Sequence, residues 1–215
     1  MRVLVFCDDT YHPAATVRAG LAPLAQAGGF DFDWIEDAAG WNPAMLRDYP
    51  VVLLSKSNVC SASNQTPWLA GATADALGEY VRAGGGLVAV HSGTASYKDW
   101  LAVRAVLGGV FISHPPPCAV QVELVDGHPL CAGVDRAFTV HDEHYQVVVD
   151  DPRVDVFLHT RSEHGVQPAG WVRREGQGLV VVLTPGHFAD VWLHPSMQQL
   201  LVNALNAVVD AQKIL

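Results

Sequence analysis

Apolar and polar positions along the first half of the chain follow two alternating periods. Four stretches have the apolar pattern of strands, and they are 2–8, 30–37, 50–56 and 87–91. Apolar residues recur at helical spacing over 14–29 and 73–86, and glycines end both of these stretches. Buried strands that alternate with helices form parallel sheets covered on both faces. This half therefore predicts an α/β fold of flavodoxin-like type, with a parallel sheet flanked by helices.

The pattern changes after residue 115. Short strand-like stretches then follow one another with little room for helices, at 119–126, 137–149, 154–161, 169–175 and 178–184. They predict antiparallel strands added to the sheet in the C-terminal half. A helical stretch over 195–215, entered through Pro195 in its first turn, closes the chain. No repeat or linker interrupts the 215 residues, so we expect a single domain over 1–215.

Composition excludes several classes of partner. The 13 Lys and Arg are scattered and the net charge is −9, so no basic stripe exists for nucleic acid. No apolar run reaches the ~20 residues of a membrane span, and the N-terminus lacks a signal-peptide pattern. We therefore expect a cytoplasmic protein without a membrane partner. The 4 cysteines show no CxxC spacing, which favours reduced thiols over a zinc ribbon or disulfides.

Polar side chains follow four of the strand-like stretches directly. They are Asp8, Asp9, Thr10, Tyr11 and His12, then Ser55 and Lys56, then His91 and Ser92, and last Thr184 and His187. Ligands of open parallel sheets bind beyond the carboxyl ends of the strands. We expect these side chains to meet in one crevice, to which three strands contribute a histidine.

The densest titratable segment is "HDEHY", residues 141–145. In a continuous strand, His141, Glu143 and Tyr145 share one face, while Asp142 and His144 share the other. Glu143 is suited to take a proton, and the Tyr145 ring is suited to cover the apolar face of a sugar. A solvated strand face formed by Asp142 and His144 is the competing interpretation.

Two other kinds of site fit the same residues. Imidazole and carboxylate groups suffice for a single divalent metal, zinc or similar, from the set His12, His91, His114, Glu143 and His187. No compact motif such as HExxH joins them, so metal-free chemistry is the main expectation. A serine hydrolase with Ser92 and His187 is a further interpretation, although the sequence around Ser92 lacks the G-x-S-x-G elbow.

Several short segments, in this order and spacing, resemble the ThuA-like family, named for trehalose utilisation. They are "GGGLVAVHSG", "GGVFISHPP", "VDGHPLCAGV", "FTVHDEHY", "VVVLTPGHFADVW" and "LLVNAL", and the resemblance runs from about residue 2 to residue 207. It implies a flavodoxin-like α/β fold related to class I glutamine amidotransferases, and a role in catabolism of 3-keto sugars and disaccharides. The nucleophilic cysteine of those relatives is missing and His91 takes its neighbourhood, which argues against glutaminase chemistry.

The residues and the resemblance together predict a carbohydrate-processing enzyme that acts on trehalose or a keto-sugar. We expect His91, Glu143 and His187 to transfer protons, because imidazole titrates near neutral pH. The expected substrate-binding residues are Tyr11, His12, Ser92, His114, Asp142, Tyr145 and Trp192. A non-catalytic sugar-binding or regulatory module in the same crevice is the alternative. The expected partner is a small carbohydrate. Edge strands also offer unpaired backbone groups to a second copy of the chain, which would allow a homo-oligomer.

Overall fold

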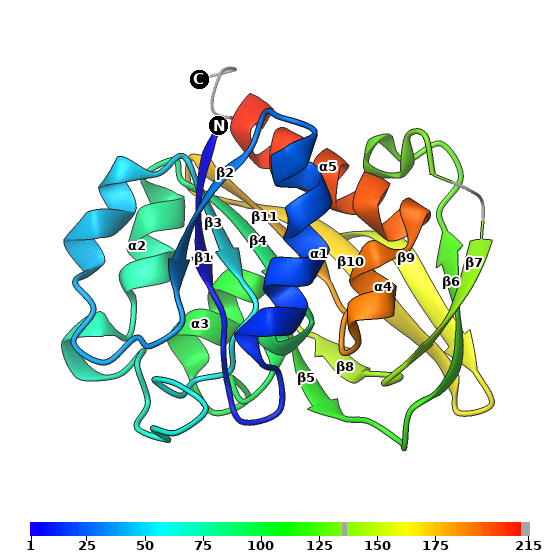
Figure 1. Cartoon of the computed structure of the whole chain (residues 1–215), viewed down its shortest axis with the longest axis horizontal. Coiled ribbons are helices and arrows are strands. Elements are labelled where there is room, and N and C mark those ends of the chain that lie inside the picture. The colour runs from blue at the N-terminus through cyan, green and yellow to red at the C-terminus, as the bar shows by residue number, and fades with distance from the viewer. Residues whose placement is uncertain (135–136, 212–215) are drawn as a thin grey trace.

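A nine-stranded mixed sheet forms the centre of the molecule in the computed structural model, which describes residues 1–134 and 137–211 (Figure 1). Five strands run parallel: β2 (Asp31–Ile35), β1 (Arg2–Phe6), β3 (Val51–Leu54), β4 (Gly86–Val90) and β11 (Gly178–Leu183). Four antiparallel strands continue the sheet: β10 (Gly165–Glu175), β9 (Asp155–Ser162), β6 (Cys118–Leu124) and β7 (Ala137–Asp142). The predicted α/β fold with added antiparallel strands is confirmed.

The inner parallel strands are buried on both faces, which explains their nearly unbroken apolar sequences. Alternate residues of β1 face opposite layers, so Val3 and Val5 pack with α1 (Ala14–Gln26) and α5 (Pro195–Asp210). Leu4 and Phe6 pack on the other side with α2 (Ala76–Arg82) and α3 (Leu101–Leu107). The helices therefore cover the two faces of the sheet.

The antiparallel half curls back toward the parallel half. Register shifts interrupt the pairing of β10 with β9 between Pro168 and Gly170 and between Gly170 and Trp171. Irregularities of this kind bend a strand and increase its local twist. The bend carries β6 and β7 round toward the short helix α4 (Ala189–Leu193), which contacts β7.

A separate two-stranded ribbon departs from the sequence expectation. The stretch 137–149 is not one strand, because β7 ends at Asp142 and β8 (Gln146–Val149) pairs with β5 (Gly109–Ser113) in the ribbon. Residues 143–145 cross between the two sheets, so the predicted strict alternation of side chains does not apply to them. The predicted closing helix is confirmed as α5, and its last four positions, 212–215, lie outside the described residues.

Short helical elements escape a reading of the sequence by periodicity. Helix α4 has 5 residues, too few turns for an apolar period to stand out, and α3, with 7 residues, was not predicted either. The described residues also include 3₁₀ turns at Pro43–Asp48, Gly71–Thr73, His91–Thr94 and Pro129–Cys131. The third of these begins directly at the end of β4 and carries two of the predicted site residues.

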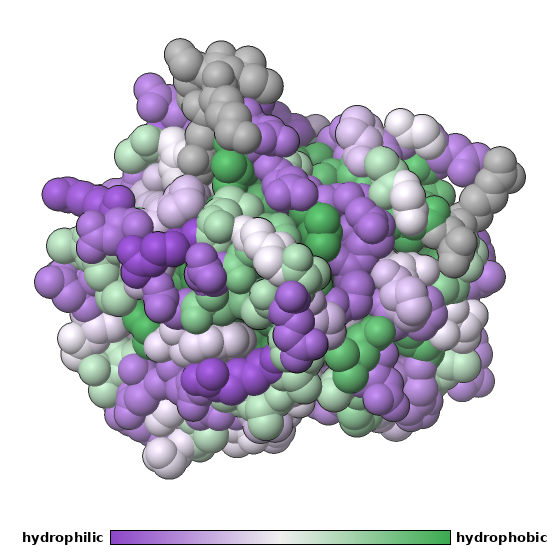
Figure 2. Space-filling view, turned by 45° about the horizontal axis from the view of Figure 1, so that its top comes forward, coloured by the Kyte–Doolittle hydropathy of each residue, from purple (hydrophilic) through white to green (hydrophobic). Residues whose placement is uncertain are grey.

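Hydrophobic residues on the surface are dispersed. Figure 2 shows small hydrophobic areas separated by hydrophilic residues over one face of the molecule. Large exposed hydrophobic side chains include Tyr11, Leu101 and Phe188. Within the described residues, no helix combines the length and apolar character needed to cross a bilayer.

Replacing Leu53 in β3 with alanine is expected to reduce the free energy of unfolding by about 2–5 kcal/mol, because the fully buried side chain leaves a cavity in the layer below α1 and α5. Denaturant titration followed by circular dichroism measures the change. Val148→Ala, in the partly exposed ribbon strand β8, is the control, with an expected loss below about 1 kcal/mol. Equal losses in both variants would contradict the described core.

Candidate functional site

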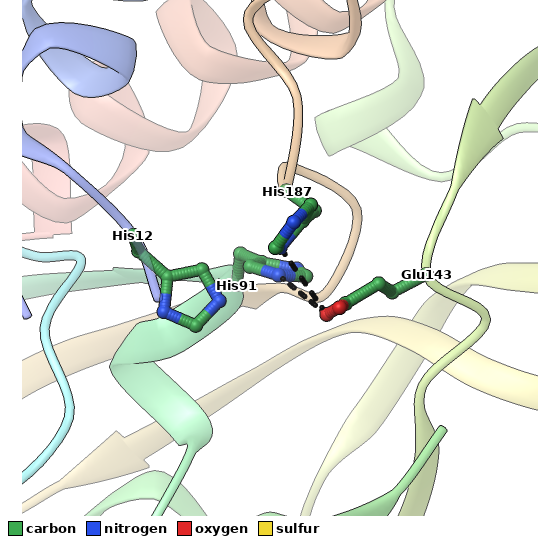
Figure 3. Close-up of side chains that lie close together, drawn as sticks. All are labelled: His12, His91, Glu143 and His187. Carbon is green, nitrogen blue, oxygen red and sulfur yellow. Dashed lines mark ion pairs between the residues drawn. The ribbon is translucent and has the colours of Figure 1, made fainter. Parts of the chain in front are cut away.

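Four side chains from separate segments meet beyond the carboxyl ends of the parallel strands (Figure 3). His12 follows β1, His91 follows β4, His187 follows β11 and Glu143 follows β7. One nitrogen or oxygen from each lies within 4.8 Å of those of the others. We call these four residues the His/Glu cluster. The structure thus brings together the three histidines at the strand exits and the glutamate of the "HDEHY" segment.

His91 is held rigidly at the end of β4. Its backbone has φ 47°, in the left-handed region. Gly93, just beyond, passes so close to β3 that an added Cβ would lie 2.1 Å from the Leu54 carbonyl oxygen. The His91 ring stacks on Tyr145 with centroids 4.1 Å apart. This tight turn fixes the direction in which the imidazole points.

Hydrogen bonding also fixes the tautomer of His91. Its Nδ1 lies 2.8 Å from the carbonyl oxygen of Thr184, which only accepts, so Nδ1 carries the proton and donates. Burial lowers the pKa of His91, which keeps the ring neutral. Nε2 therefore presents a lone pair to the cluster.

Asp9 orients His12 in the same manner. His12 Nδ1 lies 2.7 Å from Asp9 Oδ1, and Asp9 also accepts hydrogen bonds from the backbone N–H groups of Tyr11, His12 and Ser57. Burial alone would raise the pKa of Asp9, but these hydrogen bonds outweigh it and lower the pKa to about 2. The ionised carboxylate holds the proton on Nδ1 of His12 and leaves Nε2 free. Asp9 was only one of several strand-exit residues in the sequence; its spacing of three from His12 was the available signal.

Asp142 positions the loop that carries His187. Its Oδ2 accepts from Gly186 N at 2.8 Å, and its Oδ1 accepts from His187 N at 3.0 Å. Gly186 has φ 145°, and an added Cβ would lie 3.2 Å from His91 Cβ, so the loop needs glycine here. Burial raises the pKa of Asp142. Asp142 and His144 are both buried, so the alternative of a solvated strand face is wrong; the chain turns inward where β7 ends.

Glu143 lies at the centre of the remaining contacts. Its Oε2 is 3.4 Å from His91 Nε2 and 3.3 Å from His187 Nδ1, and its Oε1 is 3.4 Å from His114 Nε2. Burial alone would raise the pKa of Glu143, but the interaction with His187 outweighs it and lowers the pKa well below its usual range. The same contact with Glu143 raises the pKa of His187. Glu143 is therefore an ionised acceptor.

Solvent reaches the cluster from one side. The side chains of His114 and His187 are 35% and 19% exposed, whereas that of His91 is 1% exposed. The exposed ring of Tyr11 lies beside His12, and Phe188 packs edge-on against His187. Tyr11 thus lies at the surface where stacking on a ligand was expected. Phe188 was not singled out from the sequence, although it directly follows His187.

Three predicted substrate-binding residues lie next to the cluster but are buried. Tyr145 is buried beneath His91 and Trp192 is fully buried against Gly20 of α1, so neither offers a face to a ligand. Trp192 instead donates from Nε1 to the Gly186 carbonyl and supports the loop. Ser92 is fully buried with its Oγ 3.5 Å from Ser55 Oγ, so it is not placed as an exposed nucleophile. These are packing roles, which a one-dimensional pattern does not distinguish from pocket walls.

Known proteins resemble the chain over nearly its whole length. A family model described as ThuA, trehalose utilisation, matches residues 2–206. A ThuA-like protein from Bacteroides uniformis is 22% identical, with TM-score 0.74, and the match covers 97% of this chain and 91% of that one. A ThuA-like protein from Parabacteroides merdae is 15% identical, with TM-score 0.79 and coverages of 97% and 90%.

A third similar structure is described as a cytoplasmic protein from Salmonella typhimurium; it is 16% identical, with TM-score 0.68 and coverages of 96% and 98%. At these identities, likeness to the solved structures shows the fold alone. No curated protein sequence matches the chain.

Asp142→Asn is expected to destabilise the protein by about 1–3 kcal/mol, because the amide group turns a donor toward one of two buried N–H donors. Thermal and denaturant unfolding measure the loss. Asp190→Asn makes the same change at an exposed position in α4 and is expected to change stability by less than about 0.5 kcal/mol. An unchanged stability of Asp142→Asn would show that this carboxylate does not hold the loop.

Proposed function

The chain belongs to the ThuA family, whose description is trehalose utilisation, and from that premise we propose that it is a carbohydrate-processing enzyme with the His/Glu cluster as its reaction centre. Family membership supports a sugar-related role. The proposal adds that a substrate of trehalose or keto-sugar type is chemically changed at this cluster. We place the activity in the cytoplasm, in line with the description of the Salmonella typhimurium structure.

One observation carries the proposal: polar atoms converge in the cluster without satisfying one another. His12 Nε2, His91 Nε2 and His187 Nδ1 are buried and have no hydrogen-bond partner. Buried polar groups in folded proteins are almost always paired, because an unpaired one costs about 1–3 kcal/mol. Three such atoms around one ionised carboxylate indicate a place kept ready for a ligand rather than for packing.

The geometry suits the oxygen atoms of a sugar. The Glu143 carboxylate can accept a hydrogen bond or a proton from a substrate hydroxyl, and it is reached from the side where His114 and His187 are exposed. His91 is held as an acceptor by the Thr184 carbonyl, so in this tautomer it does not donate toward the substrate. The Tyr11 ring at the rim offers an apolar face for a sugar ring.

Hydrolysis through a covalent intermediate, as in class I glutamine amidotransferases with their nucleophilic cysteine, is not favoured. The residue at the strand exit is a histidine, His91, so no hydroxyl or thiol is presented there. Ser92 beside it is buried against Ser55. The proposed reaction therefore uses the carboxylate and imidazole groups and not a covalent serine intermediate.

Glu143→Gln is expected to lower turnover at least about 100-fold, because the neutral amide no longer accepts a proton. The assay incubates the protein with α,α-trehalose, its 3-keto derivative and a panel of other disaccharides, and it detects products by mass spectrometry. Divalent cations are added in one series and a chelator in another, so the result does not depend on the choice of metal. Glu163→Gln, at an exposed surface position, is the matched control and should retain full turnover.

Saturable binding of a sugar without product in either series would replace the enzyme proposal by the sugar-binding module. The absence of both binding and conversion across the panel would overturn the sugar proposal. Full turnover of Glu143→Gln would remove the cluster from the reaction.

A further inference from the structure

We infer that the His/Glu cluster binds one divalent transition metal ion through three imidazole nitrogens and one carboxylate oxygen. The part the ion plays in turnover rests on the proposed function, whereas its binding is measurable without any substrate. Imidazole nitrogen selects ions such as zinc over magnesium and calcium, which prefer oxygen ligands.

Two histidines are held in the tautomer that offers Nε2 to a metal ion. His12 donates from Nδ1 to the Asp9 carboxylate, and His91 donates from Nδ1 to the Thr184 carbonyl. Both Nε2 atoms therefore point lone pairs into the cluster, where they are buried and unpartnered. A carboxylate or carbonyl behind the ring is the arrangement that orients histidine ligands in metal sites. Lone pairs facing lone pairs in a buried space are unfavourable unless a cation lies between them.

Glu143 is too far from two histidines for charge-assisted hydrogen bonds but at the separation of two ligands of one ion. Its Oε2 lies 3.4 Å from His91 Nε2 and 3.3 Å from His187 Nδ1. Charge-assisted hydrogen bonds between such groups are shorter, about 2.7–2.9 Å. Two ligand atoms on a tetrahedral zinc ion, each about 2.0–2.1 Å from the metal, lie about 3.3–3.4 Å apart. The separations are those of ligand atoms around an ion.

The remaining geometry requires little movement. All four donor atoms lie within 4.8 Å of one another, so an ion that draws them together displaces each by about 1 Å or less. Figure 3 shows His12 and Glu143 approaching from opposite sides, with the rings of His91 and His187 between them. The centroids of the three rings are 4.9, 5.1 and 5.5 Å apart, so the histidines form a triangle and do not lie in a row.

The negative charges around the cluster also favour a divalent cation. Three neutral imidazoles and one carboxylate leave a divalent ion with one uncompensated positive charge. The buried carboxylates of Asp9 and Asp142 lie directly behind the ligands, one on His12 and the other on the backbone of His187. His114 contacts Oε1 of Glu143, whereas His91 and His187 contact Oε2, and it stands on the solvent side, where a sugar oxygen could become a further ligand. An expanded coordination of this kind is within the range of zinc.

Metal analysis by plasma mass spectrometry of untagged protein, followed by calorimetric titration of chelator-treated protein with Zn²⁺, tests the inference. We expect one equivalent, with affinity reduced at least about 100-fold in His12→Ala and in His187→Ala. Asp9→Asn keeps all four ligands and is expected to lose about 10- to 100-fold. His141→Ala removes an exposed histidine next to Asp142 and should bind zinc as the unaltered protein does.

Circular dichroism shows whether each variant folds. The visible absorption of bound Co²⁺ in the unaltered protein gives a second readout that needs no variant, because the absorption is strong for a four-coordinate ion and weak for a six-coordinate one. Stoichiometry near zero, weak octahedral Co²⁺ absorption, or equal loss of affinity in His141→Ala would overturn the inference. Zinc binding without turnover would leave it standing and overturn the proposed enzyme, whereas turnover by protein that binds no zinc in the titration would do the reverse.

Discussion

The Asp142 carboxylate joins the two halves of the sheet, and the site depends on this connection. In sheet order, β10, β9 and β6 separate β11 from β7. A flat sheet would place the ends of β11 and β7 roughly 19 Å apart, and the three residues that follow Leu183, up to Gly186, span only part of that distance. Asp142 nevertheless accepts hydrogen bonds from Gly186 and His187. The antiparallel half must therefore curl back over the parallel half, and this curl brings Glu143 to the histidines.

The site is assembled at a cost to local stability. His91 adopts a left-handed backbone, three imidazole nitrogens are buried without partners, and Asp142 is a carboxylate removed from water. Conformations of this kind persist only where the surrounding structure determines them strongly. Here the support comes from Tyr145 beneath the His91 ring and from Trp192, whose indole holds the Gly186 carbonyl. Several side chains that looked like ligand contacts in the sequence are the scaffold on which the contacts are built.

The sequence predicted the parallel part of the fold well, because strands buried on both faces leave unbroken apolar runs that can be recognised one at a time. His12, His91 and His187 were found because parallel strands share one carboxyl edge. Glu143 was found as a titratable residue but for the wrong geometry, since the strand ends before it. The buried positions of Tyr145 and Trp192 and the orienting roles of Asp9 and Asp142 follow from the curl of the sheet and from loop packing, which involve residues far apart in the chain and leave no local period.

The positions of the cluster residues along the chain have a mechanical consequence. They follow β1, β4, β7 and β11, which are spread from the first to the last strand along the chain. Nearly the whole chain must therefore be in place before they meet. Anything that holds all four at once acts as a reversible cross-link between the two ends of the polypeptide, closing long loops whose freedom in the unfolded chain is large. Occupancy of this small space would then set how easily the entire molecule opens.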